Sequence, residues 1–563
     1  MLILVSLFSL IALFACKKEE EETLKNDDDF SDFEDFEDPE IPSFATVELS
    51  SYEEENYIFD KNVDNTNGSV CYEIFVRSFY DTNGDGIGDF NGITEQLPYL
   101  YELGVKTLWL MPIMPSPTYH GYDVIDYYSV NPDFGTMEDF DLLLEESKKY
   151  NIEIMIDIVF NHSSTQNPWF KQSYEDYIAG NTGEDSKADW YCWTNQRQTG
   201  YSIYNGSNGI YYESRFDHSM PDLNTKCEAV RSEMVNILKY WVDKGVAGFR
   251  FDAVKYFDFE NTKYNVELLT FLHDSISVDN PEIYFVGECW DNVDVINKYH
   301  QSTFESFFTF GSSLDATGDA TIVGQVKTFN KANSFASKIE QREKIIKENN
   351  PNAYSSYFLS NHDMDRSSKN FQNEYAKLAA SLYLLLPGTP YIYYGEEIGL
   401  KGVRVTAPDD ASDVRRRLAM IWSKDDKDGE CGFPEPHRTD LMKNDQVSVG
   451  AYDQMGTNYS VWNHYKKVIQ IRNKYPFIKN SVFVNLTPQL ITTYDNVLAY
   501  ELVYGDESII VIHNFEKVNV EVDLSNLGLV EIVDEVSVAK LRPELSGSKL
   551  KIGKISTVVL KRK

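Results

Sequence analysis

Charged and polar side chains follow several apolar runs of this 563-residue chain, at positions where they could do chemistry. In "GFRFDAVKY" (248–256), Arg250 and Asp252 stand two residues apart between phenylalanines. Three further runs end in similar clusters: Asp157, Asn161 and His162 in "DIVFNH", Glu288 in "FVGECW", and Asn361, His362 and Asp363 in "FLSNHD". Carboxylates beside a fixed cation are the groups that acid–base and nucleophilic catalysis use, so these clusters predict a catalytic site.

The first cluster could also be a structural ion pair. Side chains two apart on a strand share a face, so Arg250 and Asp252 point one way, while Phe249 and Phe251 pack on the other side. Because an unpaired buried carboxylate is costly, an ion pair would explain one such cluster. It does not explain four of them, and we therefore expect all four to converge on one rim.

The elements that must position these clusters alternate between short apolar runs and amphipathic segments. A helix is expected over 136–150, with Thr136 as its N-cap and Asp139 three residues later, and another over 226–245, which ends on a glycine. The eight apolar runs are 70–76, 107–111, 152–160, 248–252, 283–288, 304–309, 357–360 and 391–394. Eight β-then-α units predict an α/β fold, a parallel (β/α)8 TIM barrel with its site at the C-terminal ends of the strands.

Two parts of the chain depart from this alternation. About sixty residues rich in Trp, Tyr, Asn and Gly follow the third run, which is too long for a connection and predicts a small inserted domain. From about residue 480, apolar residues alternate with period two, which predicts a C-terminal antiparallel β domain. The predicted boundaries are 57–162 and 223–478 for the barrel, 163–222 for the inserted domain and 479–563 for the β domain.

The four clusters resemble, in order and spacing, the sequence regions of the α-amylase family of glycoside hydrolases, family 13, over roughly residues 68–475. Glycosidic bond cleavage needs an acid that protonates the leaving oxygen and a carboxylate that faces the anomeric carbon. The resemblance implies that Asp252 is the nucleophile, Glu288 the acid and base, and Asp363 the carboxylate that holds the ring hydroxyls. Arg250 is expected to keep Asp252 ionised, while burial and neighbouring carboxylates raise the pKa of Glu288.

The same resemblance assigns sugar contacts to other positions. In "HGYDVIDYY" (120–128), it makes Tyr122 the platform under the reactive sugar and Asp123 a structural residue. His162 and His362 are expected to donate to sugar hydroxyls; their alternative role is that of hydrogen-bonded core histidines. One arginine of "DVRRRLAMIW" is also expected to reach the sugar, and the sequence leaves open whether it is Arg415, Arg416 or Arg417.

Linkage preference depends on two short segments. The small Ala253 after the nucleophile and the nearby Lys255 resemble α-1,4-acting amylases, in which the lysine contacts the leaving sugar. "MPDLN" (220–224) is similar to a group intermediate between oligo-1,6-glucosidases and neopullulanases. The expected activity is a retaining endo-hydrolysis of α-1,4-glucosidic bonds. The alternatives are an exo-α-glucosidase, an oligo-1,6-glucosidase or a transglycosylase, and a glycan-binding protein on an inactive barrel.

The loop "DTNGDGIGD" (81–89) carries oxygen atoms at alternate positions. It copies the first nine positions of an EF-hand loop, but Gly92 stands where a bidentate glutamate belongs, so an EF-hand is not expected. By resemblance to relatives that bind calcium after the first strand, we expect a structural Ca2+, the alternative being a plain Asp-Gly turn. The expected ligands are Asp81, Asn83, Asp85, the Ile87 carbonyl and Asp89.

The N-terminus reads as a targeting segment. Residues 1–15 form an apolar run too short to span a bilayer, and Leu13 to Cys16 resemble a bacterial lipobox, in which Cys16 is lipidated. An uncleaved anchor or a misassigned start is the alternative. Residues 16–56 are acidic and too polar to pack, which predicts a disordered tether. The protein is thus expected to be secreted and anchored to the bacterial cell envelope by lipid alone.

Composition narrows the possible partners. The formal net charge of -37 opposes a phosphate backbone and excludes nucleic acid, whereas 14% aromatic residues suit stacking on sugar rings. Of six cysteines, five remain after Cys16, so a disulfide framework is not indicated, although Cys192 and Cys227 could bridge. We expect a monomer that acts on α-glucans.

Overall fold

The computed structural model describes residues 47–563, apart from 52–55, 260, 311–331, 372–373, 405–408, 426, 433–446, 448 and 539. The predicted signal segment 1–15, the lipidation site Cys16 and most of the predicted tether lie outside the described residues. Among the helices that are described, none has the length and apolar character needed to cross a membrane.

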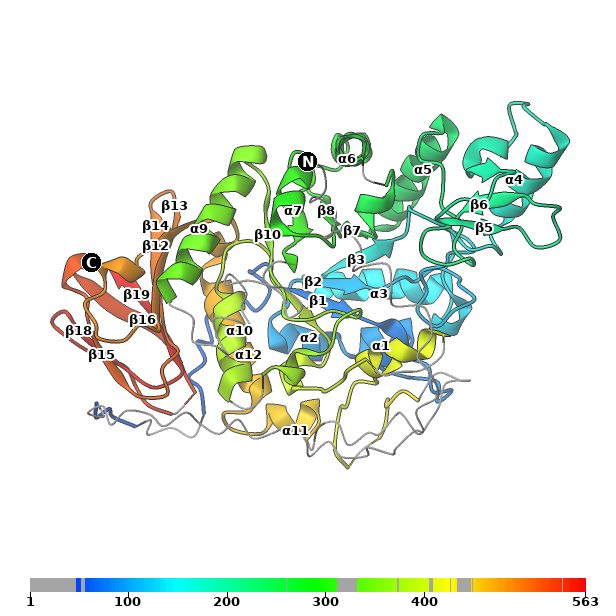
Figure 1. Cartoon of the computed structure of the whole chain (residues 1–563). Helices are drawn as coiled ribbons and strands as arrows, with labels where there is room; N and C mark the ends of the chain where they lie inside the picture. Colours follow the sequence, from blue (N-terminus) through cyan, green and yellow to red (C-terminus); the bar gives the residue numbers. More distant parts are fainter. Residues whose placement is uncertain are drawn as a thin grey trace, which may run out of the picture. The chain divides into compact units, whose positions relative to one another are not determined.

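Eight parallel strands form one nearly closed sheet, in the order β10-β9-β8-β7-β3-β2-β1-β11 (Figure 1). A single bridge between Phe358 and Tyr391 joins its two outer strands. The predicted (β/α)8 barrel is thereby confirmed. The strands are β1 (Cys71–Ile74), β2 (Thr107–Leu110), β3 (Glu153–Ile158), β7 (Gly248–Phe251), β8 (Tyr284–Gly287), β9 (Ser306–Phe308), β10 (Tyr354–Ser356) and β11 (Tyr391–Tyr393).

Helices connect consecutive strands of the barrel, as β-then-α units require. The expected capping box opens α3, where Thr136 and Asp139 each accept a hydrogen bond from the backbone N–H of the other. Gly245 ends α5 in the left-handed conformation, with φ of 110°, which a residue with a side chain rarely adopts. The main helices are α1 (Phe90–Glu95), α2 (Leu97–Leu103), α3 (Met137–Lys149), α5 (Glu228–Lys244), α6 (Thr262–Ser277), α7 (Val293–Tyr299), α9 (Ala332–Asn349), α10 (Glu374–Leu384) and α12 (Val461–Lys474).

The seventh strand begins earlier than predicted. We expected it at 357–360, but β10 spans Tyr354–Ser356, and Phe358 makes only the closing bridge. This strand is buried although it contains two serines, because their hydroxyls are paired: Ser355 donates to Glu343 at 2.6 Å, and Ser356 bonds to Ser306 of β9. Apolar periodicity could not reveal a strand whose buried side chains are polar.

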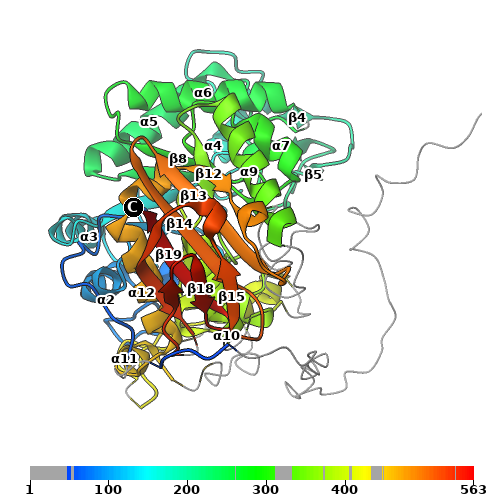
Figure 2. The same ribbon diagram turned by 90° about the vertical axis from the view of Figure 1, so that its left-hand side faces the viewer.

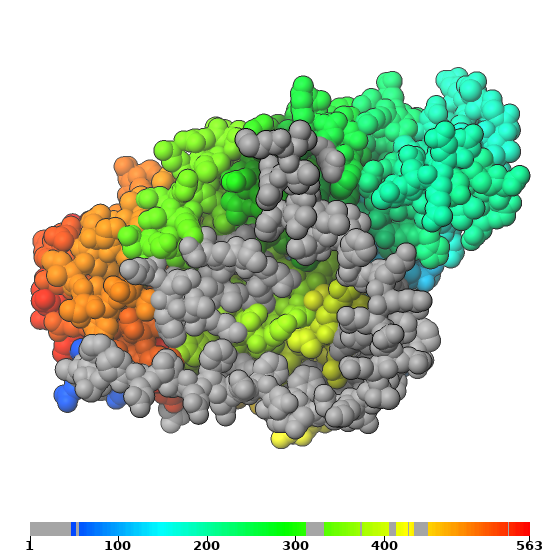
Figure 3. Space-filling model, in the orientation of Figure 1, coloured from blue at the N-terminus to red at the C-terminus, as the bar shows by residue number. Residues whose placement is uncertain are grey.

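The insertion between β3 and α5 contains α4 (Pro168–Ala179) and a small antiparallel sheet of β4 (Trp193–Thr194), β6 (Tyr211–Glu213) and β5 (Tyr201–Ile203). Its aromatic residues pack on one another; Phe170 and Trp193, for example, stack with ring centroids 5.2 Å apart. In Figure 3 the cyan and teal atoms of this region form one continuous part of the surface. Most of its tryptophan and tyrosine content therefore builds a local core.

The C-terminal region is antiparallel, as predicted. Figure 2 shows β13, β14 and β19 side by side in a five-stranded sheet, which packs against a three-stranded sheet through apolar residues such as Val497, Ile510 and Leu550. Backbone atoms of Val47 and Ser50, within the predicted tether, hydrogen-bond to this region, so the end of that segment is structured. The strands are β12 (Val482–Asn485), β13 (Val497–Tyr504), β14 (Glu507–Asn514), β15 (Val520–Asp523), β16 (Val530–Ser537), β17 (Glu544–Ser546), β18 (Lys549–Ile552) and β19 (Ser556–Arg562).

Candidate active site

Arg250 of β7 holds three carboxylates at the C-terminal ends of neighbouring strands. Its side chain is 1% exposed. One terminal nitrogen donates to Asp157 of β3 at 2.9 Å and to Asp252 at 2.7 Å, while the other lies 3.0 Å from Glu288, which follows β8. The neighbouring phenylalanines pack on the opposite side, where Phe251 contacts Phe285. The predicted common face of Arg250 and Asp252 is confirmed.

A second ion-pair chain positions Asp363, which follows β10. Its carboxylate lies 3.0 Å from Nε2 of His362 and 2.7 Å from a guanidinium nitrogen of Arg417. The other nitrogen of His362, Nδ1, lies 2.6 Å from the carboxylate of Glu73 on β1. Asp363 is thus held from both sides, while its side chain remains 35% exposed.

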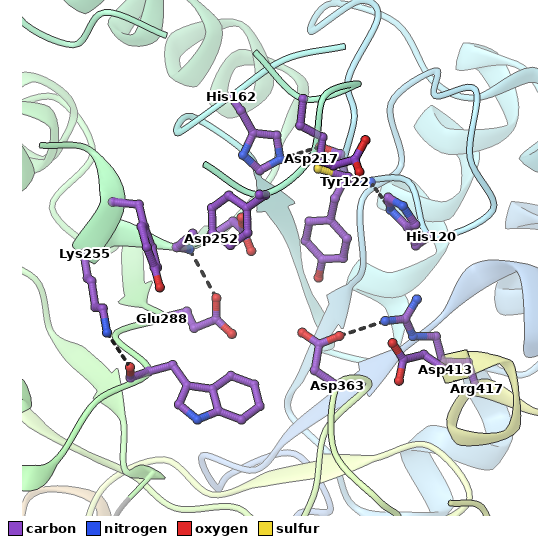
Figure 4. A pocket seen from close by; sticks show the side chains of 15 residues that line it. His120, Tyr122, His162, Asp217, Asp252, Lys255, Glu288, Asp363, Asp413 and Arg417 are labelled. Atoms are coloured by element: carbon purple, nitrogen blue, oxygen red, sulfur yellow. Dashed lines mark hydrogen bonds and ion pairs between the residues drawn. The ribbon is translucent and has the colours of Figure 1, made fainter. Parts of the chain in front are cut away.

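The carboxylates bound by Arg250 and the carboxylate of Asp363 face one cavity of about 530 Å³. Asp252, Glu288 and Asp363 all line it, and Figure 4 shows their side chains around the same space, with Glu288 beside Asp252 and Asp363 across from them. The three residues follow β7, β8 and β10, and although Asp252 and Asp363 are more than 110 positions apart in the chain, all three meet at one cavity. This convergence is the geometry that four separate clusters in the sequence predicted.

Burial raises the pKa of both Asp252 and Glu288. Burial raises the pKa of Glu288 to about 7; Arg250 opposes this rise, and the charges of Asp252 and Asp363 add to it. Burial also raises the pKa of Asp252, to about 6, against the opposing charge of Arg250. The charge of Arg250 opposes burial at both carboxyl groups without cancelling it, so both pKa values stay raised.

The pKa of Asp363 is shifted in the opposite direction. Burial acts to raise its pKa, but the charge and hydrogen bond of His362, together with Arg417 and Arg250, outweigh burial and hold it well below the usual range. Burial acts to lower the pKa of His362, yet Asp363 and Glu73 raise it to about 10. At neutral pH the site thus holds an ionised Asp363, a protonated His362 and a Glu288 that can carry a proton.

Comparisons with known proteins agree with this geometry. The family described as "Alpha amylase, catalytic domain" matches residues 73–481. Alpha-amylase 3 of Dictyoglomus thermophilum is 35% identical over 513 residues, covering 90% of this chain and 95% of that protein. The chain belongs to the α-amylase family of glycoside hydrolases.

Other relatives of this glycoside hydrolase carry different names. The oligo-1,6-glucosidase of Parageobacillus thermoglucosidasius is 30% identical over 526 residues, covering 80% of this chain and 90% of that protein. Among solved structures, "Eubacterium rectale Amy13B" matches with a TM-score of 0.82 and 35% identity, covering 92% of this chain and 100% of that chain. The comparisons thus include both α-amylases and glucosidases.

The predicted sugar-contacting residues of this α-amylase family member divide into two groups. Tyr122, His162 and Lys255 line the cavity. The Tyr122 hydroxyl donates to Asp157 at 3.1 Å and lies 2.7 Å from Nε2 of His362. His362 itself is fully buried behind Tyr122 and Asp363 and is not part of the cavity wall, so in this structure it positions its neighbours.

The arginine run has one member in the cavity wall. Arg417 lines the cavity, binds Asp363 and donates from Nε to the backbone of His362 at 3.0 Å. Arg416 instead pairs with Asp365 and Asp413, each at 2.9 Å. Side-chain direction on η9 (Asp409–Arg417), which residue types alone do not give, thus places Arg417 in the cavity wall, and its contact with the sugar stays a prediction.

Sequence reasoning missed several residues of the wall. Motif position could have indicated His120, beside Tyr122, and Trp290, two residues after Glu288. No local signal marks Phe216 and Asp413, which reach the cavity from the insertion and from the loop after β11, whereas Met220 opens the segment "MPDLN" already noted for linkage preference. Asp157 and Glu73 were also not assigned roles, although they bind Arg250 and His362.

The loop 81–89 is folded by its own oxygen atoms. Asp81 accepts from the backbone N–H groups of Asn83, Gly84 and Gly86 at 2.7–3.1 Å, and Asp89 caps α1 through the N–H of Gly92 at 2.7 Å. The oxygen-only donor set suits the preference of Ca2+. In the described part of the chain, no three His, Cys, Asp or Glu side chains form a ready metal cluster, so such a site would depend on Asn83 and the Ile87 carbonyl as well.

Cys192 and Cys227 do not bridge in this structure, where both are free thiols.

Proposed function

We propose that this protein is a retaining, endo-acting hydrolase of α-1,4-glucosidic bonds in starch, glycogen or maltooligosaccharides. The observation that carries the proposal is the meeting of Asp252, Glu288 and Asp363 around one cavity, with the first two held by a single guanidinium. A glycan-binding protein on an inactive barrel would not need a general acid. The pKa of Glu288, raised to about 7, suits a group that gives up a proton near neutral pH.

In the first step, Glu288 gives its proton to the glycosidic oxygen as that bond to the anomeric carbon breaks, and Asp252 attacks the anomeric carbon to form a glycosyl ester. In the second step, Glu288, now a carboxylate, takes a proton from water, whose oxygen attacks the anomeric carbon and releases Asp252. Asp363, ionised throughout, accepts hydrogen bonds from ring hydroxyls as positive charge develops on the ring.

Retention is favoured by the arrangement around Arg250. Carboxyl groups lie about 5–5.5 Å apart in retaining enzymes and about 6.5–9.5 Å apart in inverting ones, which must fit a water between them. Asp252 and Glu288 are bound by the two terminal nitrogens of one guanidinium, at 2.7 and 3.0 Å, which brings both carboxylates to one part of the cavity wall, and the family resemblance makes Asp252 the attacking group. We infer that Asp252 attacks directly.

The α-1,4 linkage is supported by Ala253 and by relatives named α-amylase. Ala253 adopts the left-handed conformation, with φ of 47°, and its N–H donates to Glu288 at 3.2 Å. A valine, as the resemblance gives for oligo-1,6-glucosidases, would be more strained at this angle. The second candidate function is exo action on short substrates, which relatives named oligo-1,6-glucosidase support.

Hydrolysis of soluble starch should release a ladder of maltooligosaccharides before glucose accumulates, because an endo enzyme cuts within chains. Chromatography of products at low conversion measures this, with pullulan and isomaltose as substrates that test 1,6 bonds. Immediate glucose as the main product would show exo action, and faster cleavage of isomaltose than of maltose would assign the activity to 1,6 bonds.

We also propose that Asp81, Asn83, Asp85, the Ile87 carbonyl and Asp89 hold a structural Ca2+. Saturating Ca2+ should then raise the melting temperature of EGTA-treated protein by a few degrees, since a ligand at one hundred times its Kd adds about 2.7 kcal/mol to the free energy of unfolding. In Asp85→Asn, the amide oxygen can still accept from Ile87, which donates to Asp85 at 2.8 Å, but the charge is lost. The Ca2+ concentration for half-maximal stabilisation should rise at least about tenfold.

The exposed Asp506, in the turn between β13 and β14, supplies the control, because Asp506→Asn also removes one carboxylate charge. This variant should respond to Ca2+ as the parent does. If Ca2+ stabilised the parent, Asp85→Asn and Asp506→Asn equally, or stabilised none of them, a calcium site in the loop would be contradicted.

We further propose a secreted, monomeric protein held at the bacterial cell envelope through lipid on Cys16. The sequence alone supports this location, and labelling with radioactive palmitate, expected for the parent and lost in Cys16→Ser, tests it.

A further inference from the structure

Glu73 places a carboxylate inside the barrel. β1 pairs Glu73 with Trp109 of β2 in register, and Trp109 contacts Phe308 of β9, a strand that is not its neighbour, so its ring lies in the interior. Side chains at paired positions of neighbouring strands point to the same face of a sheet, so Glu73 points inward as well. It is 1% exposed and does not line the catalytic cavity. Because a buried carboxylate is costly without a cation beside it, Glu73 needs a charged partner there.

His362 is that partner, and its contacts require a proton on both ring nitrogens. Nδ1 lies 2.6 Å from Oε1 of Glu73, and Nε2 lies 3.0 Å from Oδ2 of Asp363. An ionised carboxylate only accepts hydrogen bonds, and a neutral imidazole has a single N–H to give. In the neutral form, one ring nitrogen would therefore turn a lone pair toward a carboxylate. The two contacts together are those of an imidazolium.

The surroundings of His362 give its two carboxylate partners different roles. Asp363 also binds Arg417 through its other oxygen, at 2.7 Å (Figure 4), and in the proposed reaction it accepts from sugar hydroxyls. Glu73 faces no substrate, so it is the partner whose contact stays the same when a sugar binds. The titratable and charged groups near His362 on the surrounding elements are Glu73, His120, Tyr122, Asp157, Arg250, Glu288, Asp363 and Arg417.

We propose that Glu73 is a positioning residue, whose buried charge keeps His362 doubly protonated throughout the reaction, so that Nε2–H holds Asp363 toward the sugar ring. The inference rests on the proposed action on α-glucans and adds to it a residue on β1 that acts without touching the substrate. Hydrogen bonds between charged groups are about twice as strong as neutral ones. Loss of the charge of His362 should therefore loosen Asp363 even where a hydrogen bond remains.

Glu73→Gln keeps the shape of this side chain and removes its charge. The amide can donate to Nδ1, so a neutral His362 with its proton on Nε2 becomes possible. In NMR spectra of protein with 15N-labelled histidine, assigned with His362→Gln, both nitrogens of His362 should stay protonated from about pH 5 to about pH 9 in the parent, because its pKa is raised to about 10. In Glu73→Gln, His362 should titrate within this range.

The kinetic test uses α-maltosyl fluoride, which needs little help from an acid. Formation of the glycosyl ester by Glu288→Gln should then be independent of pH above about 7. Adding Glu73→Gln should lower this rate about five- to tenfold, because a neutral His362 holds Asp363 less firmly. The loss should appear as the pH rises through the value at which His362 titrates by NMR, a coincidence that a purely structural defect would not produce.

Two variants separate charge from shape. Glu73→Asp shortens the side chain but keeps its charge, so His362 should stay protonated to about pH 9 and the rate should remain within about threefold of Glu288→Gln alone. Glu343→Gln removes another buried carboxylate, which accepts from Ser355 and Tyr357 at 2.6 and 2.7 Å, and should change neither measurement.

A His362 that keeps both protons to about pH 9 in Glu73→Gln would overturn the inference, as would a greater loss of rate in Glu73→Asp than in Glu73→Gln. Failure of the parent to cleave maltohexaose would instead refute the proposed function. The NMR titration needs no turnover, so the two ideas fail separately.

Discussion

Asp252→Ala should lower kcat on maltohexaose by about 10⁴-fold or more, because the variant lacks the group that forms the glycosyl ester. Azide at high concentration should restore turnover. It is small enough to enter the space left by the carboxylate and attacks the anomeric carbon from the same face, while Glu288 protonates the leaving oxygen. The product of this rescue is a β-glycosyl azide, which NMR identifies by its anomeric coupling.

Asp363→Ala is the matched control, since it also removes a carboxylate from the same cavity. Its activity should fall, but azide should not restore it, because Asp363 stabilises charge and forms no bond to carbon. If azide restored the activity of Asp363→Ala and not that of Asp252→Ala, Asp363 would be the nucleophile and Asp252 the carboxylate that stabilises charge. An α-configured azide from Asp252→Ala would exclude attack from the face assigned to the nucleophile.

The placement of Arg250 and Asp252 was predictable because two elementary rules determine it. Side chains alternate along a strand, and the carboxyl ends of parallel strands meet at one rim. The same rules brought Glu288 and Asp363 to that rim. What the sequence could not give was how many carboxylates one cation serves: Arg250 also binds Asp157, and burial keeps the pKa of Asp252 raised despite the charge of Arg250.

Other features that the sequence did not predict have similar physical causes. The direction of a side chain on a short irregular helix places Arg417 in the cavity wall, and β10 was misplaced because its buried serines are paired by hydrogen bonds. The contact of His362 with Glu73, almost 290 residues earlier and 2.6 Å away, was also not foreseen, and the predicted contact of His362 with a sugar stays a prediction. Each of these features is a pairing between distant parts of the chain, for which local periodicity holds no signal.

Glu288→Gln should lower kcat on maltohexaose by about 10²–10⁴-fold, because the amide cannot protonate the leaving oxygen. Starch binding should persist, since glutamine has the shape of the protonated acid and its oxygen can still accept from Ala253, whose N–H lies 3.2 Å from Glu288. α-Maltosyl fluoride separates this role from a structural one. Fluoride leaves with little protonation, so the variant should form the glycosyl ester from it at a rate near that of the parent.

The pH dependence of kcat/KM gives the sharpest evidence for this assignment. The parent should lose activity on maltohexaose as the pH rises through about 7, because Glu288 then gives up the proton that the leaving oxygen needs, and again at low pH, as Asp252 becomes protonated. With maltosyl fluoride, Glu288→Gln should keep the acidic limb and lack the basic one. A basic limb that survives the substitution would place the proton on another group, and equal slowing on both substrates would mean that Glu288 shapes the site without acting as its acid.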